Sequence, residues 1–137
     1  MRFNKLIPEL RVLNIEKSLG FYRDILGFRV EYERSENKFA FISYMGAQMM
    51  LEQNTNPHWK TGKLKYPYGR GVNFQIEVRN LNDLLVRLNK NGYPLKLKAK
   101  ENWYRKEDKL LGLKEFLVLD PDGYLLRFSQ RIGEKKA

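Results

Sequence analysis

The sequence predicts an α+β fold in which two βαβββ modules form a curved mixed sheet with a shared cleft. Apolar periods occur in the order strand, helix and three strands, and this order occurs twice along the chain. Val12-Leu13-Asn14-Ile15 and Val78-Arg79-Asn80-Leu81 match at a separation of about 66 residues, which indicates an internal repeat. The length of 137 residues is typical of one domain. We therefore expect one domain, 1–137, with modules at about 5–53 and 71–130 joined by a connector at 54–70.

The first module begins with a short apolar stretch and a helix. Residues 5–12 are mostly apolar, and Pro8 favours an edge strand because proline cannot donate a hydrogen bond to a neighbouring strand. Asn14 can cap a helix from Ile15 to Leu26, along which apolar side chains recur at helical spacing, and Gly27 ends that helix. Three strands are predicted after it, at 28–34, 38–45 and 47–53.

The second module repeats this order after the connector. The connector, 54–70, has no apolar period and contains prolines, glycines and basic residues. A strand is predicted at 72–78, followed by a helix from Asn80 to about Asn91 that Gly92 ends. The remaining segments are predicted as an extended stretch at 93–99, a charged loop at 101–112, a strand at 114–119, a turn at 120–123 and a strand at 124–130.

The composition excludes several kinds of chemistry. The chain has no cysteine, which rules out disulfides, thiol nucleophiles and cysteine-ligated metals. Its single histidine, His58, restricts metal sites and acid/base catalysis near neutral pH. No apolar run has the length of a signal peptide or membrane span, so we expect a cytoplasmic protein with no membrane partner. The formal net charge of +10 favours anionic partners, nucleic acid included.

Several segments carry a family pattern. Leu10 to Arg29 resembles the opening of the vicinal oxygen chelate superfamily, which contains glyoxalases, bleomycin resistance proteins and dioxygenases. Gly112 to Phe116 and Leu119 to Phe128 resemble the ending found in its bleomycin resistance branch, and Met50-Leu51-Glu52 resembles the end of that branch's first module. The resemblance spans about residues 7–130 and implies the glyoxalase/bleomycin resistance fold. It also implies a homodimer with clefts between the two chains.

The resemblance separates metal enzymes from metal-free binding proteins. In the superfamily, metal ligands lie on the first and last strands of each module, and divalent ions there require histidine nitrogen or carboxylate oxygen. The corresponding positions here hold Ile7, Met50, Asn73 and Arg127, with Glu52 as the remaining nearby carboxylate. We therefore expect no metal, no cofactor and no catalytic residue.

Arg127 is the first candidate for ligand binding. A cation on an otherwise apolar strand is costly to bury without a partner, and Glu115 on the preceding strand is the nearest candidate. Two interpretations remain open for this pair. It is either a structural ion pair or a group that binds a polar part of a ligand.

Aromatic side chains are the other candidates. Phe39 and Phe41 on a predicted strand fit core packing as well as a stacking surface for a flat ligand. Trp59, Trp103 and Tyr104 are predicted in charged loops, where large aromatics often mark ligand lids. The full set of predicted ligand-binding residues is Phe39, Phe41, Met50, Glu52, Trp59, Trp103, Tyr104, Glu115 and Arg127.

Three functions follow, in order of preference. The first is a metal-free protein that binds a small antibiotic-like molecule, of bleomycin type or another aromatic natural product, and confers resistance by sequestration. The second is a glyoxalase-like metal-dependent lyase or isomerase with an atypical site around Glu52. The third is a basic accessory module for weak, non-specific nucleic-acid binding, favoured by the run Trp103-Tyr104-Arg105-Lys106. The positive charge disfavours a cationic drug unless Glu52 or Glu115 makes the site acidic.

Overall fold

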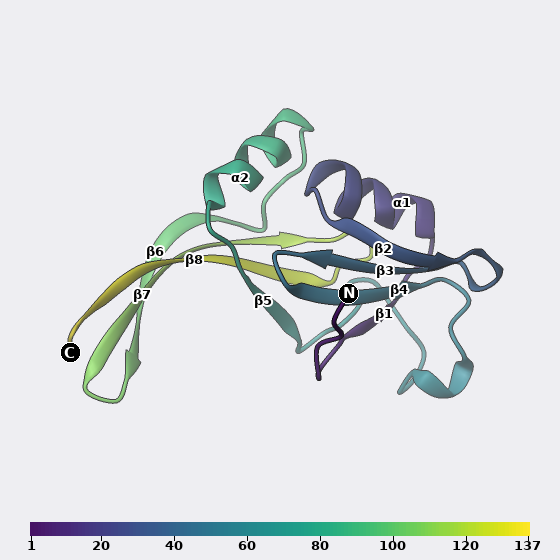
Figure 1. The fold of residues 1–137 in the computed structure, drawn as a ribbon, viewed down its shortest axis with the longest axis horizontal. Helices are drawn as coiled ribbons and strands as arrows, with labels where there is room; N and C mark the ends of the chain where they lie inside the picture. The colour runs from purple at the N-terminus through teal and green to yellow at the C-terminus, as the bar shows by residue number, and fades with distance from the viewer. The chain divides into compact units, whose positions relative to one another are not determined.

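Two four-stranded sheets, each with its own α-helix, make up the structure, a computed structural model that describes residues 1–137 (Figure 1). Unit 1 consists of Met1–Tyr68 and Pro121–Gly123, and unit 2 consists of Gly69–Asp120 and Tyr124–Ala137. The predicted α+β class and the repeated strand, helix and three-strand order are confirmed. None of the helices has the length and apolarity required to cross a membrane.

Unit 1 has the strand order β1-β4-β3-β2, in which only β1 and β4 run parallel. The helix is where the sequence predicts it, and the Asn14 side chain caps it by accepting hydrogen bonds from the backbone N–H groups of Glu16 and Lys17. It is α-helical only at first and continues as a π-helix over Gly20–Ile25. The bounds are β1 Glu9–Arg11, α1 Ile15–Leu19, β2 Arg29–Arg34, β3 Phe39–Tyr44 and β4 Ala47–Glu52.

The first strand is shorter than predicted. Only Glu9–Arg11 pairs as a strand, although residues 5–12 were expected to do so. Proline has no N–H to donate, so Pro8 contributes only its carbonyl, which accepts from the N–H of Met50. The buried face of the unit 1 sheet contributes alternate residues such as Leu10, Ile42 and Leu51 to the core.

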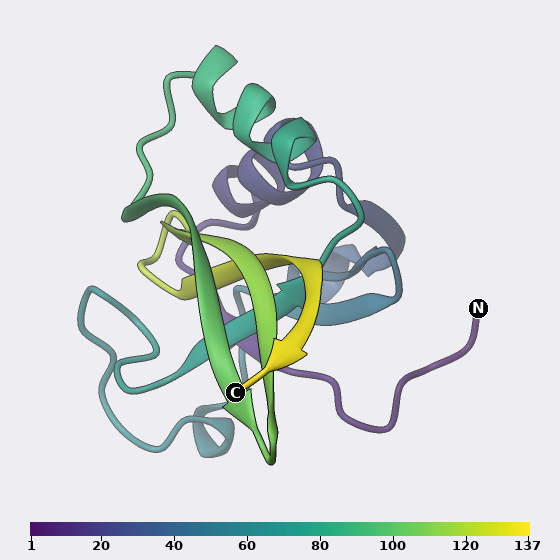
Figure 2. The ribbon, with the colours of Figure 1, turned by 90° about the vertical axis from the view of Figure 1, so that its left-hand side faces the viewer.

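Unit 2 has the strand order β5-β8-β7-β6, in which only β5 and β8 run parallel (Figure 2). The helix α2 is capped by Asn80 and buries one apolar stripe, formed by Leu81, Leu84 and Leu88. The bounds are β5 Asn73–Glu77, α2 Leu81–Lys90, β6 Leu97–Lys106, β7 Lys109–Leu119 and β8 Leu125–Lys136.

The prediction of a charged loop at 101–112 is wrong. These residues form most of a long antiparallel hairpin between β6 and β7, which turns at Glu107 and Asp108. The hairpin continues alongside β8 beyond Ser129, where the pairing of β8 with β5 ends. Charged side chains on both faces remain exposed there, so the alternation typical of a half-buried strand is missing from the sequence.

Candidate ligand-binding site

A pocket of about 260 Å³ opens on the face of the unit 2 sheet opposite α2. Strands β6, β7 and β8 form it, and the antiparallel register places Glu115 opposite Lys100 on one side and Ser129 on the other. Arg127 is two residues before Ser129 and therefore lies on the same face. The lining residues are Leu97, Lys98, Lys100, Asn102, Tyr104, Glu115, Phe116, Leu117 and Arg127.

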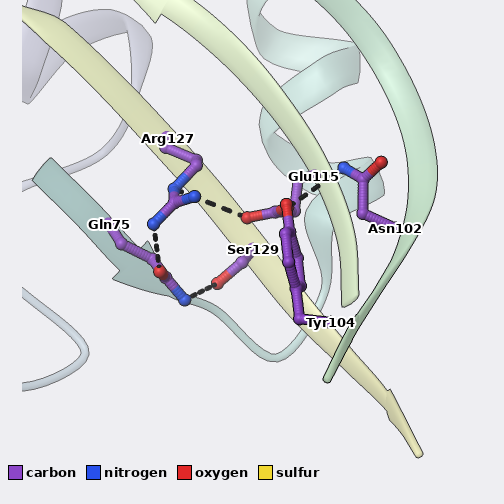
Figure 3. Close-up of polar contacts among 6 residues, drawn as sticks. All are labelled: Gln75, Asn102, Tyr104, Glu115, Arg127 and Ser129. Carbon is purple, nitrogen blue, oxygen red and sulfur yellow. Dashed lines mark hydrogen bonds and ion pairs between the residues drawn. The ribbon is translucent and has the colours of Figure 1, made fainter. Parts of the chain in front are cut away.

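Glu115 lies at the centre of a hydrogen-bonded network in this pocket (Figure 3). Its side chain is only 4% exposed, and its Oε1 accepts hydrogen bonds from the Tyr104 hydroxyl and, at 3.1 Å, from Asn102 Nδ2. Its Oε2 lies 3.5 Å from Arg127 Nε. The hydrogen bond to Glu115 raises the pKa of Tyr104, and burial adds to the shift. Tyr104 is therefore held as a neutral donor toward the carboxylate.

Arg127 links this network to the neighbouring strand β5. Its Nη2 donates to Gln75 Oε1 at 2.5 Å, and Gln75 Nε2 donates to Ser129 Oγ at 3.4 Å (Figure 3). The ion pair with Glu115 predicted from the sequence is present. The Arg127 side chain is 32% exposed, so the guanidinium is held on two sides and still reaches the pocket.

The carboxylate and the phenol of the pocket, which could serve as general base or proton donor, are already engaged. The ionisable side chains of the pocket are those of Lys98, Lys100, Tyr104, Glu115 and Arg127. Both Glu115 and Tyr104 are engaged with each other, and a guanidinium stays protonated at physiological pH. The arrangement can therefore hold a ligand through hydrogen bonds and charge.

The residues that stand at the superfamily's metal positions do not suit a divalent ion. In unit 2, Arg127 presents a permanent positive charge, and Asn73 is exposed at the start of β5. In unit 1, Met50 offers a thioether, and Ile7 has no donor atom. No three histidine, cysteine or acidic side chains come together in a way that could hold a metal.

Four of the predicted binding residues lie in unit 1, on the sheet face opposite α1: Phe39, Phe41, Met50 and Glu52. The ring of Phe41 is 1% exposed and stacks on Tyr32 with centroids 5.2 Å apart. Phe3 packs edge-on against Phe41 at 5.4 Å. Aromatic neighbours within unit 1 thus cover part of this surface.

Glu52 forms a carboxyl pair with Glu9 on the adjacent strand β1. Burial raises the pKa of Glu9, and both a hydrogen bond with Glu52 and the negative charge of Glu52 raise it further. The positive charge of Arg34 acts in the opposite direction. Arg34 lies over the ring of Phe39, with its guanidinium carbon 3.8 Å from the ring centroid. Neither carboxyl is part of the unit 2 pocket.

Neither tryptophan lines the unit 2 pocket. Trp59 ends a short 3₁₀ segment, Pro57–Trp59, and is 67% exposed. Trp103 and Tyr104 are adjacent on β6 and therefore point to opposite faces of the sheet. The Trp103 ring lies over Gly112, and a Cβ added to Gly112 would come within 2.6 Å of the ring. Lys135 Nζ lies 4.1 Å from the centroid of the same ring.

Sequence reasoning missed Lys98, Lys100, Asn102 and Gln75 as residues of the site. Lys100, Asn102 and Tyr104 occur at every second position, which is the spacing of one face of a strand. The expectation of a loop at 101–112 concealed this signal. Gln75 was overlooked because its role depends on the parallel pairing that places it beside Arg127.

Comparison with known proteins agrees with the fold and the motifs. A family model described as Glyoxalase/Bleomycin resistance protein/Dioxygenase superfamily matches residues 3–128. The chain belongs to this superfamily. The resemblance inferred from the sequence motifs is therefore confirmed. Proteins named bleomycin resistance protein from Geobacillus stearothermophilus and Staphylococcus aureus are each 29% identical to it, over 92% of this chain and 96% of theirs.

Solved structures of other proteins share the fold. TioX from Micromonospora sp. ML1 superposes with a TM-score of 0.73 at 15% identity, covering 95% of this chain and 100% of TioX. A virulence protein from Salmonella typhimurium gives a TM-score of 0.68 at 19% identity, covering 96% of this chain and 100% of that protein. At these identities the likeness concerns the fold alone.

Proposed function

We propose that this chain binds one small molecule in the unit 2 pocket and confers resistance by sequestering it. The observation that carries the proposal is the network around Glu115, in which Tyr104, Asn102 and Arg127 are held in place by mutual contacts before any ligand arrives. Preorganised polar groups beside apolar walls are typical of ligand sites. The relatives named bleomycin resistance proteins support an antibiotic-like or other aromatic natural product as the ligand.

The proposed mechanism is capture without turnover and without a metal. In the unit 2 pocket, the carboxylate and phenol that could transfer protons are engaged with each other. The guanidinium of Arg127 occupies the position at which an enzyme of the superfamily would bind its metal, and it would repel a cation. Binding energy in such a site lowers the free concentration of the ligand and leaves its covalent structure unchanged.

A thermal-shift panel tests the binding proposal. Ligands that bind the native state raise the midpoint of unfolding, and the panel would include bleomycin-type and other aromatic natural products. We expect at least one to stabilise the wild-type chain, and Arg127→Met to reduce that stabilisation. A panel with no stabilising compound at concentrations far above a micromolar Kd would contradict the proposal.

Two further measurements separate capture from catalysis. Mass spectrometry of the ligand after long incubation should return it unchanged, with one molecule bound per chain. Elemental analysis of protein purified without chelator should find no stoichiometric nickel, zinc, manganese or iron. A converted ligand or a stoichiometric metal would favour the lyase or isomerase alternative.

We also propose that the chain acts in the cytoplasm as a homodimer. The edge of β8 beyond Ser129 supports pairing, because the β5 pairing ends there and no other strand pairs with β8 on that edge. An unpaired strand edge is a ready template for another chain. Sedimentation velocity over a range of concentrations should detect the dimer, and a monomer throughout would contradict it.

A further inference from the structure

The charges of the unit 2 pocket indicate the class of ligand that it selects. We propose that it prefers molecules carrying a carboxylate, or a comparable anionic group, on a small apolar body. The inference rests on the proposed function, since it assumes that the unit 2 pocket is the binding site. On this proposal, Glu115 does not make the unit 2 pocket a site for a cationic ligand.

The only carboxylate of the pocket is enclosed. Its Oε1 is covered by the donors of Tyr104 and Asn102. Its Oε2 is buried without a hydrogen-bond partner and is paired only through charge with Arg127 Nε, which is buried as well, at 3.5 Å. A cationic ligand could reach this carboxylate only by displacing the Tyr104 and Asn102 donors or the charge of Arg127, which is costly in a buried network. Glu115 is therefore a poor recognition element for a cation.

The cations of the pocket are accessible. Lys98 and Lys100 are exposed at the rim, and neither takes part in the ion pairs found in unit 2. Arg127 adds a third positive charge and remains 32% exposed after its contact with Glu115. Three cations thus face one enclosed carboxylate, and the formal net charge of +10 for the whole chain acts in the same direction.

The remaining walls suit a compact apolar group. Leu97 and Leu117 line the pocket together with the ring of Tyr104. The volume of about 260 Å³ lies just below the range of roughly 300–1,000 Å³ that is typical of small-molecule sites. The pocket therefore fits a small aromatic acid or the acidic end of a larger molecule.

Three probes with one ring system test the charge preference. The probes are 2-naphthoate, neutral 2-naphthamide and 2-naphthylmethylammonium, and their affinities would be measured by calorimetry at low and moderate salt. Binding would be located by ¹⁵N chemical-shift changes. We expect the carboxylate to bind at least about tenfold more tightly than the ammonium, with the amide between them, and its advantage to shrink as salt screens the charges.

A matched pair of variants separates the local field from the overall charge. Lys100→Met removes a cation that lines the pocket, whereas Lys114→Met removes an equal charge from the opposite face of β7, where the side chain is exposed. We expect Lys100→Met to weaken naphthoate by about three- to tenfold and to leave the amide unaffected. Lys114→Met should change neither affinity.

The outcomes distinguish the two levels of the proposal. Equal binding of all three probes at the pocket amides would overturn the preference for anions and leave the binding site in place. Equal weakening by Lys100→Met and Lys114→Met would assign the preference to net charge and overturn the pocket's role in it. If no probe perturbs the pocket amides, the site given under the proposed function is wrong, and the inference falls with it.

Discussion

The corresponding sheet faces of the two units have become different surfaces. In unit 1, the parallel strands β1 and β4 place Glu9 beside Met50. In unit 2, the corresponding strands β5 and β8 place Gln75 beside Arg127. The unit 1 face carries aromatic rings packed on one another, such as Phe41 on Tyr32. The unit 2 face carries a polar network with an open pocket. The same strand order therefore supports a packed surface in one module and a binding surface in the other, because the side chains differ and the β6–β7 hairpin of unit 2 is longer than its counterpart in unit 1.

The largest effect is expected from breaking the packed surface. Phe41→Ala should lower the free energy of unfolding by about 3–5 kcal/mol, since the ring is 1% exposed and its removal leaves a cavity between Phe3 and Tyr32. Chemical denaturation would measure the change. A loss below about 1 kcal/mol would show that this surface is not packed in solution.

Disrupting the unit 2 network should cost less stability and affect binding. Arg127→Ala removes the partner of a buried carboxylate, which still accepts from Tyr104 and Asn102. We expect a loss of about 1–3 kcal/mol, moderated because Arg127 is partly exposed and solvent screens its charge. The double variant with Glu115→Gln should recover part of this stability but none of the anion binding. Unchanged naphthoate affinity in Arg127→Ala would show that the pair is only structural.

A substitution beneath Trp103 probes the other face of the same hairpin. Gly112→Ala places a methyl group 2.6 Å from the ring, so the ring must move, at a cost of about 1–2 kcal/mol. Tryptophan fluorescence should change, while ligand affinity in the pocket should not. A large loss of affinity would connect the two faces of β6, contrary to their separation by strand alternation.

The smallest effect concerns the carboxyl pair of unit 1. The folded pKa of Glu9 is raised above 4.5, so its contribution to stability is present at low pH and is lost as pH rises from 4.5 through the folded value. Glu9→Gln should therefore stabilise the chain at neutral pH, by about 1 kcal/mol or less for a partly exposed group. It should also flatten the pH dependence of unfolding relative to Glu36→Gln, an exposed control. An unchanged pH profile would contradict the shift.

The sequence predicted features that depend on short-range chemistry. The Asn14 cap and the helix that begins after Asn80 are local patterns, and each is present. The Arg127–Glu115 pair was predictable because the two residues lie on strands joined by a short turn. The π-helical continuation over Gly20–Ile25 was not predictable, because its apolar spacing also fits an α-helix.

Residue patterns and motifs were thus sufficient for the fold class, the module repeat and the superfamily. They could not locate the pocket. Lys100, Asn102, Glu115 and Gln75 meet only through the register of four strands, and the exposed charges of the β6–β7 hairpin hid its strand character. Whether Glu115 makes the site acidic also depended on its neighbours, because a carboxylate enclosed by Tyr104, Asn102 and Arg127 no longer attracts a cation as a free one would.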